Sequence, residues 1–222
     1  MALTKVTGGL LGNLPTGTSN VAVGDTALDS IESGAQYNVA IGSAAGTAIT
    51  TGDNDTLIGY AAGDALTTGS NNIAIGRDAL GADTLGSQSI AIGRLALGSQ
   101  NFTTATDVYN VAIGSQSGLS VTTGIMNTLV GGLAGDALTD ADYNVAIGFH
   151  ALGGDTLGSR SVAVGVNALF SQNFTSATDA YNIGIGFNAG TSISTGVQNT
   201  LIGGNTGDAL TTGSQCTFIG MN

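Results

Sequence analysis

Side chains that could carry out catalysis are few and scattered in this 222-residue chain. His150 is the single histidine, so a triad with a second histidine is impossible, and the acidic residues form no matched pair for acid–base work. His150 also stands two residues after a recurring glycine, where other copies of the same segment carry Ala44, Asp78, Leu95 and Asn167. A solvated turn residue is therefore favoured over a catalytic base. We expect no enzymatic activity.

Metal and cofactor sites are also poorly supported. Cys216 is the only cysteine, which excludes a disulfide framework and a thiolate metal site. Asp83 and Asp155, in GADTLG and GGDTLG, resemble a fragment of the calcium-binding β-roll repeat, but that motif needs consecutive copies and these lie 72 residues apart. A calcium- or sugar-binding module remains a minor alternative. The Gly-x-Gly strings lack the lysine of a phosphate loop, so we expect no cofactor.

The charge balance limits the partners. Lys5, Arg77, Arg94 and Arg160 are the only basic residues, and the formal net charge is −11. Nucleic acids and anionic membranes are bound through clusters of basic residues, so both partners are disfavoured. No apolar run approaches the ~18 residues of a membrane helix, which argues against membrane insertion. Hydrophobic residues make up 42% of the chain, enough for a folded core despite 37 glycines.

An internal repeat organises the chain. The hexapeptide YNVAIG of residues 37–42 recurs at 109–114 and 143–148, and looser copies fill most of the sequence. Spacings of 17 and 21 residues combine into a super-repeat of 72 residues, with copies at 38–109 and 110–181 and a partial copy at 182–222. The glycines that end the motif form one column: Gly24, Gly42, Gly59, Gly76, Gly93, Gly114, Gly131, Gly148, Gly165, Gly186, Gly203 and Gly220. Tandem repeats of this length predict a solenoid over residues 20–222, preceded by an attachment or capping segment at 1–19.

The composition of each repeat predicts a short β-strand before the glycine. The residue that precedes the glycine is always Val or Ile, as in Ile41, Ile75, Ile113 and Ile147. A second strand is expected after the glycine, in segments such as TAIT (47–50) and DALT (64–67). We therefore predict an all-β parallel β-solenoid of about twelve rungs with two sheets, in which glycine occupies a turn with positive φ or a close approach between rungs.

Alternation along the strand predicts how the chain assembles. The Val/Ile side chains share one face and the Ala/Leu side chains share the other, and both faces are apolar. A thin roll covers only one of them, so the other requires a second copy of the chain. We expect Val and Ile to form the core and Ala to form the contact between subunits of a homo-oligomer.

The tandem strings NVAIGSAA (38–45), NIAIGRDA (72–79) and NVAIGFHA (144–151) resemble the YadA-like head repeat of trimeric autotransporter adhesins. The resemblance covers residues 20–222. It implies a left-handed β-roll, a homotrimer and a surface that binds host matrix or cells. The rungs are longer than is usual in that family, and no signal peptide, stalk or membrane anchor is expected in this chain.

The opening MALTKVTGGLL resembles the start of bacteriophage tail-fibre and virion appendage proteins. Such proteins use trimeric β-structure and leave the cell by lysis without a signal peptide. The resemblance implies a virion location, attachment to another virion protein through the N-terminus and contact with a host-surface receptor. The alternative is the head fragment of a bacterial surface adhesin.

Recognition residues are sought where the repeat is interrupted. Two rungs carry a four-residue insertion, in SQNFTTATDVY (99–109) and SQNFTSATDAY (171–181), and insertions in solenoids form loops on one face. Phe102, Tyr109, Phe174 and Tyr181 are therefore candidate interaction residues. An alternative is that these four side chains fill the seam between subunits.

Overall fold

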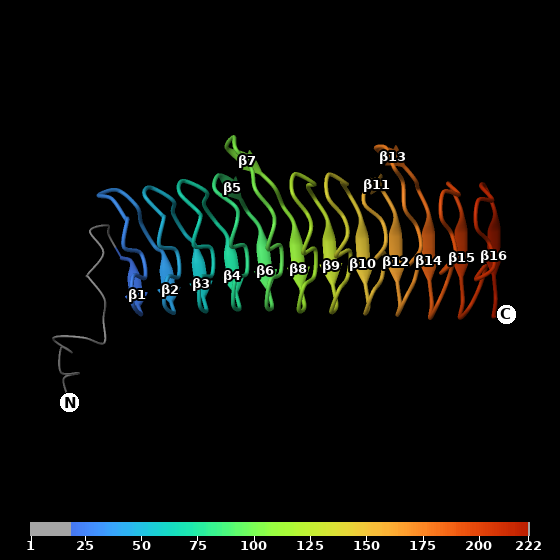
Figure 1. The fold of residues 1–222 in the computed structure, drawn as a ribbon, viewed down its shortest axis with the longest axis horizontal. Helices are drawn as coiled ribbons and strands as arrows, with labels where there is room; N and C mark the ends of the chain where they lie inside the picture. Colours follow the sequence, from blue (N-terminus) through green and yellow to red (C-terminus); the bar gives the residue numbers. More distant parts are fainter. Residues whose placement is uncertain (1–18, 222) are drawn as a thin grey trace, which may run out of the picture.

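The computed structural model describes residues 19–221, which form a rod of stacked rungs (Figure 1). Residues 1–18, which hold nearly all of the expected attachment segment, lie outside the described part. Twelve three-residue strands pair in parallel and in register to form one sheet along the whole rod. These strands are β1 (Val21–Val23), β2 (Val39–Ile41), β3 (Thr56–Ile58), β4 (Ile73–Ile75), β6 (Ile90–Ile92), β8 (Val111–Ile113), β9 (Thr128–Val130), β10 (Val145–Ile147), β12 (Val162–Val164), β14 (Ile183–Ile185), β15 (Thr200–Ile202) and β16 (Thr217–Ile219). The predicted all-β parallel solenoid of twelve rungs is confirmed.

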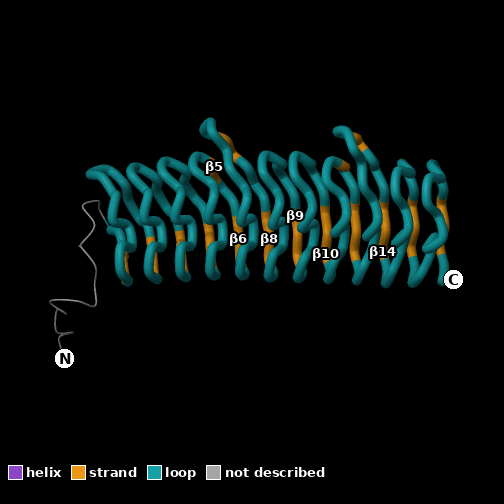
Figure 2. Tube along the Cα trace, viewed as in Figure 1, coloured by secondary structure: helices purple, strands orange, loops and turns teal. Residues whose placement is uncertain are grey.

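The prediction of a second sheet along the rod, formed by the segments after the glycines, is wrong. The segments after the glycine are turns and bends, and most of each rung is loop (Figure 2). In the segment 47–50, the backbone N–H groups of Ala48 and Thr50 donate to the next rung, but Ile49 N donates 3.1 Å back to Gly46 O. Because Ile49 closes a turn instead of pairing with a neighbouring rung, no regular ladder forms there.

Four further strands of two residues lie in or beside the long rungs. β5 (Gly86–Ser87) pairs with β7 (Thr106–Asp107), and β11 (Gly158–Ser159) pairs with β13 (Thr178–Asp179). The loops that carry β7 and β13 extend beyond the outline of the other rungs (Figure 1). The two insertions therefore project from the rod, on the same side and four rungs apart.

The two faces of the sheet are reversed relative to the expectation. The middle residue of each strand points into the rod and is buried from β1 to β15, as with Ala40, Leu57 and Ala112. The flanking Val, Ile and Thr residues are all at least partly exposed, and Ile41, Ile113 and Ile147 are exposed outright. The Ala/Leu column is thus the core, and the Val/Ile column is the outer face.

Side chains from the turns explain why small residues suffice on the inner face of the strands. Leu80 and Leu97 enter the interior from the turns that follow Ala74 and Ala91. Where a strand carries a leucine instead, the turn carries glycine: a Cβ on Gly63 would lie 2.8 Å from Leu57 Cδ2. The narrow core therefore has room for one large side chain at these positions, supplied by the strand or by the turn but not by both.

The glycine column is required for both of the predicted reasons. Gly114 has φ of +140°, and a Cβ at that position would lie 2.4 Å from the carbonyl oxygen of Gly131 in the next rung. The other column glycines that are followed by another rung have the same conformation. Each of them faces the carbonyl oxygen of the column glycine in the next rung. They are Gly24, Gly42, Gly59, Gly76, Gly93, Gly131, Gly148, Gly165, Gly186 and Gly203.

Candidate interaction surface

A column of buried amides runs along the inside of the rod, four residues before each glycine. The backbone N–H of Asn127 donates to Asn110 Oδ1 at 2.8 Å, and the N–H of Asn144 donates to Asn127 Oδ1 at 2.9 Å. The side-chain amide of Asn127 donates to Ala141 O at 2.7 Å in the same rung. Each asparagine thus joins two rungs and closes its own rung, so the asparagines of this column are buried with their hydrogen bonds made.

At each long rung, a buried glutamine of that rung and a buried acid of the rung before it supplement the amide column. Asp83 Oδ1 accepts hydrogen bonds from the backbone N–H groups of Gly86 and Phe102, both at 3.1 Å. Its Oδ2 accepts a bond from Gln100 Nε2 at 2.6 Å. Three donors therefore satisfy this carboxylate within the chain. The equivalent acid, Asp155, is held in the same way.

Gln100 also bridges the gap that serine leaves in the amide column. Ser89 stands where most rungs have asparagine, and its hydroxyl oxygen accepts a bond from Gln100 Nε2 at 3.0 Å. Gln100 Oε1 accepts a bond from Asn110 Nδ2 at 2.9 Å in the next rung. Gln172 and Ser161 repeat the arrangement. Neither glutamine is predicted from the sequence, although a Ser in the asparagine column together with a longer rung is a signal for such a bridging side chain.

The four aromatic candidates of the long rungs divide into two pairs. Phe102 and Phe174 are only 7% and 6% exposed, so both rings are buried within their own chain. They are therefore excluded both as surface recognition residues and as fillers of a seam between subunits. Tyr109 and Tyr181 are 46% and 49% exposed and remain available for contacts.

The exposed tyrosines belong to a longer stripe at the edge of the sheet. Tyr109, Met126, Tyr143, Arg160 and Tyr181 occupy the same position in five successive rungs, and each is exposed with φ between +50° and +63°. We call these five residues the aromatic stripe. The Arg160 guanidinium lies 4.6 Å from the ring centre of Tyr143 and 6.0 Å from that of Tyr181, which places a cation between two aromatic rings.

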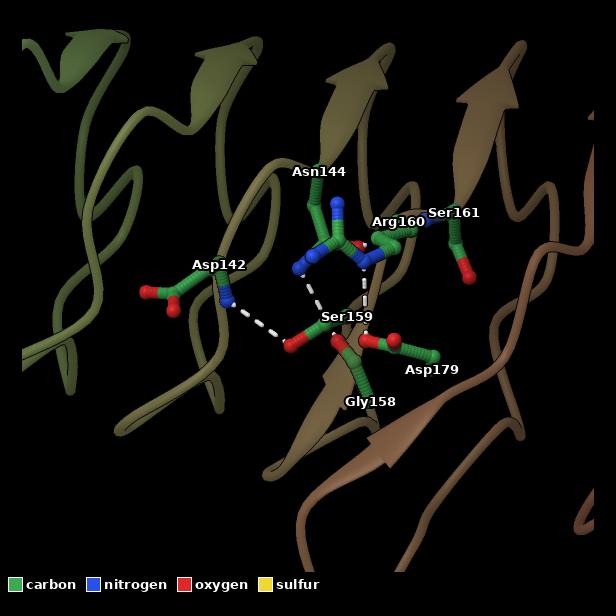
Figure 3. Close-up of polar contacts among 7 residues, drawn as sticks. All are labelled: Asp142, Asn144, Gly158, Ser159, Arg160, Ser161 and Asp179. Atoms are coloured by element: carbon green, nitrogen blue, oxygen red, sulfur yellow. Dashed lines mark hydrogen bonds and ion pairs between the residues drawn. The ribbon is translucent and has the colours of Figure 1, made fainter.

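Loop contacts hold Arg160 in this stripe (Figure 3). Its Nε lies 2.9 Å from Asp179 Oδ1 of the projecting loop, and this hydrogen bond raises the pKa of the guanidinium. Beside it, the backbone N–H of Asp142 donates to Ser159 Oγ at 3.0 Å. Partial burial raises the pKa of the Asp142 carboxyl. The ion pair is exposed, so it orients the loop more than it stabilises the fold.

The outer face of the sheet is the second exposed apolar feature. It presents two parallel columns of mostly Val and Ile side chains over all twelve strands, and none of these side chains is buried by the described residues. Contiguous apolar patches of this extent mark interaction sites in soluble proteins. We call it the outer β-face.

The residues singled out by their chemistry, His150, Cys216 and the scattered acids, lie apart from one another along residues 19–221. His150 lies in a turn with φ of +54°, between the rings of Phe149 and Phe170 at centroid distances of 4.3 and 5.4 Å. The described residues contain no cluster of three or more metal-ligating side chains. Cys216 is partly buried in the amide column, where its backbone N–H donates to Asn199 Oδ1. The same part of the chain has no helix that could cross a membrane.

Comparisons of the chain with protein-family models, with curated proteins and with solved structures find no match.

Proposed function

We propose that the chain forms a homotrimeric, non-enzymatic rod that serves as a fibre or decoration of a virion and contacts the host surface. The observation that carries the proposal is the outer β-face, which is apolar over its whole length. Each Val or Ile side chain that becomes fully buried contributes ~1.5–3 kcal/mol. Two columns over twelve strands therefore provide a large driving force for association between copies of the chain.

The contact between subunits is proposed for the face opposite to the one first expected. The Ala side chains of the strands are already buried in the core of the single chain, so they cannot contact a partner. Val and Ile project outward in register from rung to rung, and a like face of another copy complements them. The threefold symmetry and the left-handed turn of the roll come from the resemblance to the adhesin head repeats.

The projecting loops and the aromatic stripe are the proposed contacts with a receptor. Tyr109 and Tyr181 flank the two insertions, and the loop tips carry exposed polar residues such as Thr104. Exposed aromatic and arginine side chains are enriched in the binding hot spots of interfaces. A virion location rests on the opening MALTKVTGGLL, and the adhesin head of a bacterial surface protein is the second candidate, favoured by the repeat motif itself.

A charge placed on the outer β-face tests the proposed subunit contact. Ile113 is 38% exposed in mid-rod, so Ile113→Asp should leave the single chain folded while placing a charge in the subunit contact. We expect native mass spectrometry to give a trimer for the wild type and a monomer for I113D. Thr104→Asp, which adds the same charge at an exposed loop tip, and His150→Ala should both remain trimeric.

A folded wild-type monomer would contradict the assembly. A trimeric I113D would contradict the placement of the contact on this face. The virion and the bacterial surface are separated by the neighbouring genes: capsid and tail genes support the first, and an export and anchor module supports the second.

A further inference from the structure

The buried amide column contains one carboxyl group, Asp55 in the third rung. Its surroundings are those of an asparagine: the Asp55 N–H donates to Asn38 Oδ1 at 2.9 Å, and Asp55 Oδ1 accepts a bond from the Asn72 N–H at 2.8 Å. Its second oxygen, Oδ2, is fully buried and has no hydrogen-bond partner. An unpaired buried oxygen of an ionised carboxylate would be costly, so its protonation state needs a physical account.

The other rungs show which group belongs at the position of Oδ2. In every asparagine of the column from Asn38 onward, the side-chain Nδ2 donates to the carbonyl oxygen of the residue fourteen positions later, at 2.7–3.1 Å. For Asp55 that residue is Gly69. A carbonyl oxygen cannot pair with a carboxylate oxygen, but it accepts a hydrogen bond from a carboxylic acid.

The geometry around Asp55 matches that of a rung in which the bond is made. A Cβ on Gly52 would lie 2.4 Å from Gly69 O and 3.2 Å from Asp55 Oδ2. Two super-repeats later, Gly196 and Asn199 are the equivalents of Gly52 and Asp55. A Cβ on Gly196 would lie 2.2 Å from Gly213 O and 3.1 Å from Asn199 Nδ2. There, Nδ2 and the carbonyl oxygen are hydrogen-bonded at 2.8 Å. Asp55 Oδ2 and Gly69 O are thus placed like the donor and the acceptor of that hydrogen bond.

We propose that Asp55 is a neutral carboxylic acid that donates a hydrogen bond from Oδ2 to Gly69 O, and that its ionisation makes the third rung a pH-sensitive joint of the rod. This joint is independent of the proposed assembly, because Asp55 faces the interior of its own chain. It is a proton-binding site within a stack whose other column members are uncharged: asparagine, serine and cysteine.

The electrostatic surroundings agree with this geometry. Burial raises the pKa of Asp55 to about 7, and the hydrogen bonds from Asn72 only partly oppose that effect. Asp53 is the titratable group that faces it, and its negative charge raises the pKa further. The neighbours from the adjoining rungs, Asn38 and Asn72, are uncharged amides. No basic side chain of residues 19–221 is among the groups that shift this pKa.

The direction of the pH effect follows from linkage. Between pH 3.8, the ordinary value for this carboxyl, and about 7, the folded chain holds a proton that the unfolded chain has lost. Stability in this rung therefore falls as the pH rises through that window and is constant above it. The equilibrium constant for opening rises roughly tenfold per pH unit within the window.

Amide hydrogen exchange of the full chain tests the proposal, with Asp55→Asn as the variant. Comparing the two proteins at the same pH cancels the intrinsic pH dependence of exchange. We expect peptides within residues 52–72 to exchange faster in the wild type than in D55N, by a ratio that grows roughly tenfold per unit from pH 5 to about 7 and then stays level. Peptides of the C-terminal rungs should show a ratio of one throughout.

A gain-of-site variant provides the matched control. Asn127 is the equivalent of Asp55 one super-repeat later. Asn127→Asp should transfer the same pH dependence to peptides within residues 124–144. The proposal is overturned if the ratio of wild type to D55N does not change with pH, or if D55N is the less protected protein. It is also overturned if the infrared band of a protonated carboxyl, present at pH 5.5 in the wild type but not in D55N, is missing.

Discussion

At the scale of the residue, the column glycines are the least replaceable positions. Gly114→Ala would place a methyl group 2.4 Å from Gly131 O at a φ of +140°, so it combines a backbone clash with a strained conformation. Strain of this kind costs about 1–3 kcal/mol by itself. We expect G114A to lower the free energy of unfolding by at least that amount in denaturant titrations.

Gly132, in the turn of the next rung, provides the control for this substitution. A Cβ at Gly132 would have its nearest neighbour in the Phe149 ring at 3.5 Å, an ordinary contact distance, and the φ of Gly132 is not in the left-handed region. Gly132→Ala should therefore change the unfolding free energy by less than about 0.5 kcal/mol. Equal losses for G114A and G132A would mean that contact between rungs does not explain the glycine column.

The role of the column glycine could be predicted from the sequence because its period and its residue type point to the same backbone requirement. Which residues of the strand point inward could not be predicted from the sequence. Ala112 and Ile113 are both apolar, so alternation alone does not say which of them is core. The deciding fact is the width of the interior, which Leu97 and Leu152 already fill from the turns. That width follows from the closed geometry of the rung, which no short stretch of sequence encodes.

At the scale of the element, the two long rungs depend on a buried polar cluster rather than on their strands. Gln100 holds Asp83, Ser89 and Asn110 together across adjacent rungs. Gln100→Ala would leave a buried carboxylate oxygen and a buried amide each short of a partner. Each loss costs about 1–3 kcal/mol. We expect Q100A to reduce the melting temperature and to increase proteolysis within residues 99–109.

Gln198→Ala is the comparison for this element. Gln198 is exposed, and its side-chain Oε1 accepts one hydrogen bond, from Gln215 Nε2 at 3.0 Å, so loss of the side chain should leave stability and proteolysis almost unchanged. If both variants behave alike, the cluster does not support the long rung. The length of the insertion predicted a loop, but the inward turn of Phe102 depends on the Asp83 bond to its backbone, which links residues nineteen positions apart.

At the scale of the whole molecule, the rod is a chain of nearest-neighbour contacts. Every main strand pairs only with the strands of the rungs before and after it, from β1 to β16. Stability is then approximately a sum over rungs and their interfaces, without contacts between distant parts of the rod. The 72-residue period matters at this scale, because it restores the same sequence of short and long rungs.

A deletion of one complete super-repeat tests this view. Removal of residues 110–181 joins Tyr109 to Asn182 and brings β6 beside β14, with each ladder position facing its equivalent. We expect a folded rod with an unchanged β-rich circular dichroism spectrum and a length reduced by about 19 Å in small-angle scattering, which is four rungs at ~4.8 Å. Removal of residues 110–173 joins Tyr109 to Phe174 and leaves residues 174–181 as an eight-residue excess in the rung between β6 and β14, without the Asp155 that holds Phe174. That variant should unfold at a lower temperature or aggregate. If the in-register deletion failed as the other one does, stability would have to depend on contacts beyond adjacent rungs, and the super-repeat would not be the unit from which the rod is built.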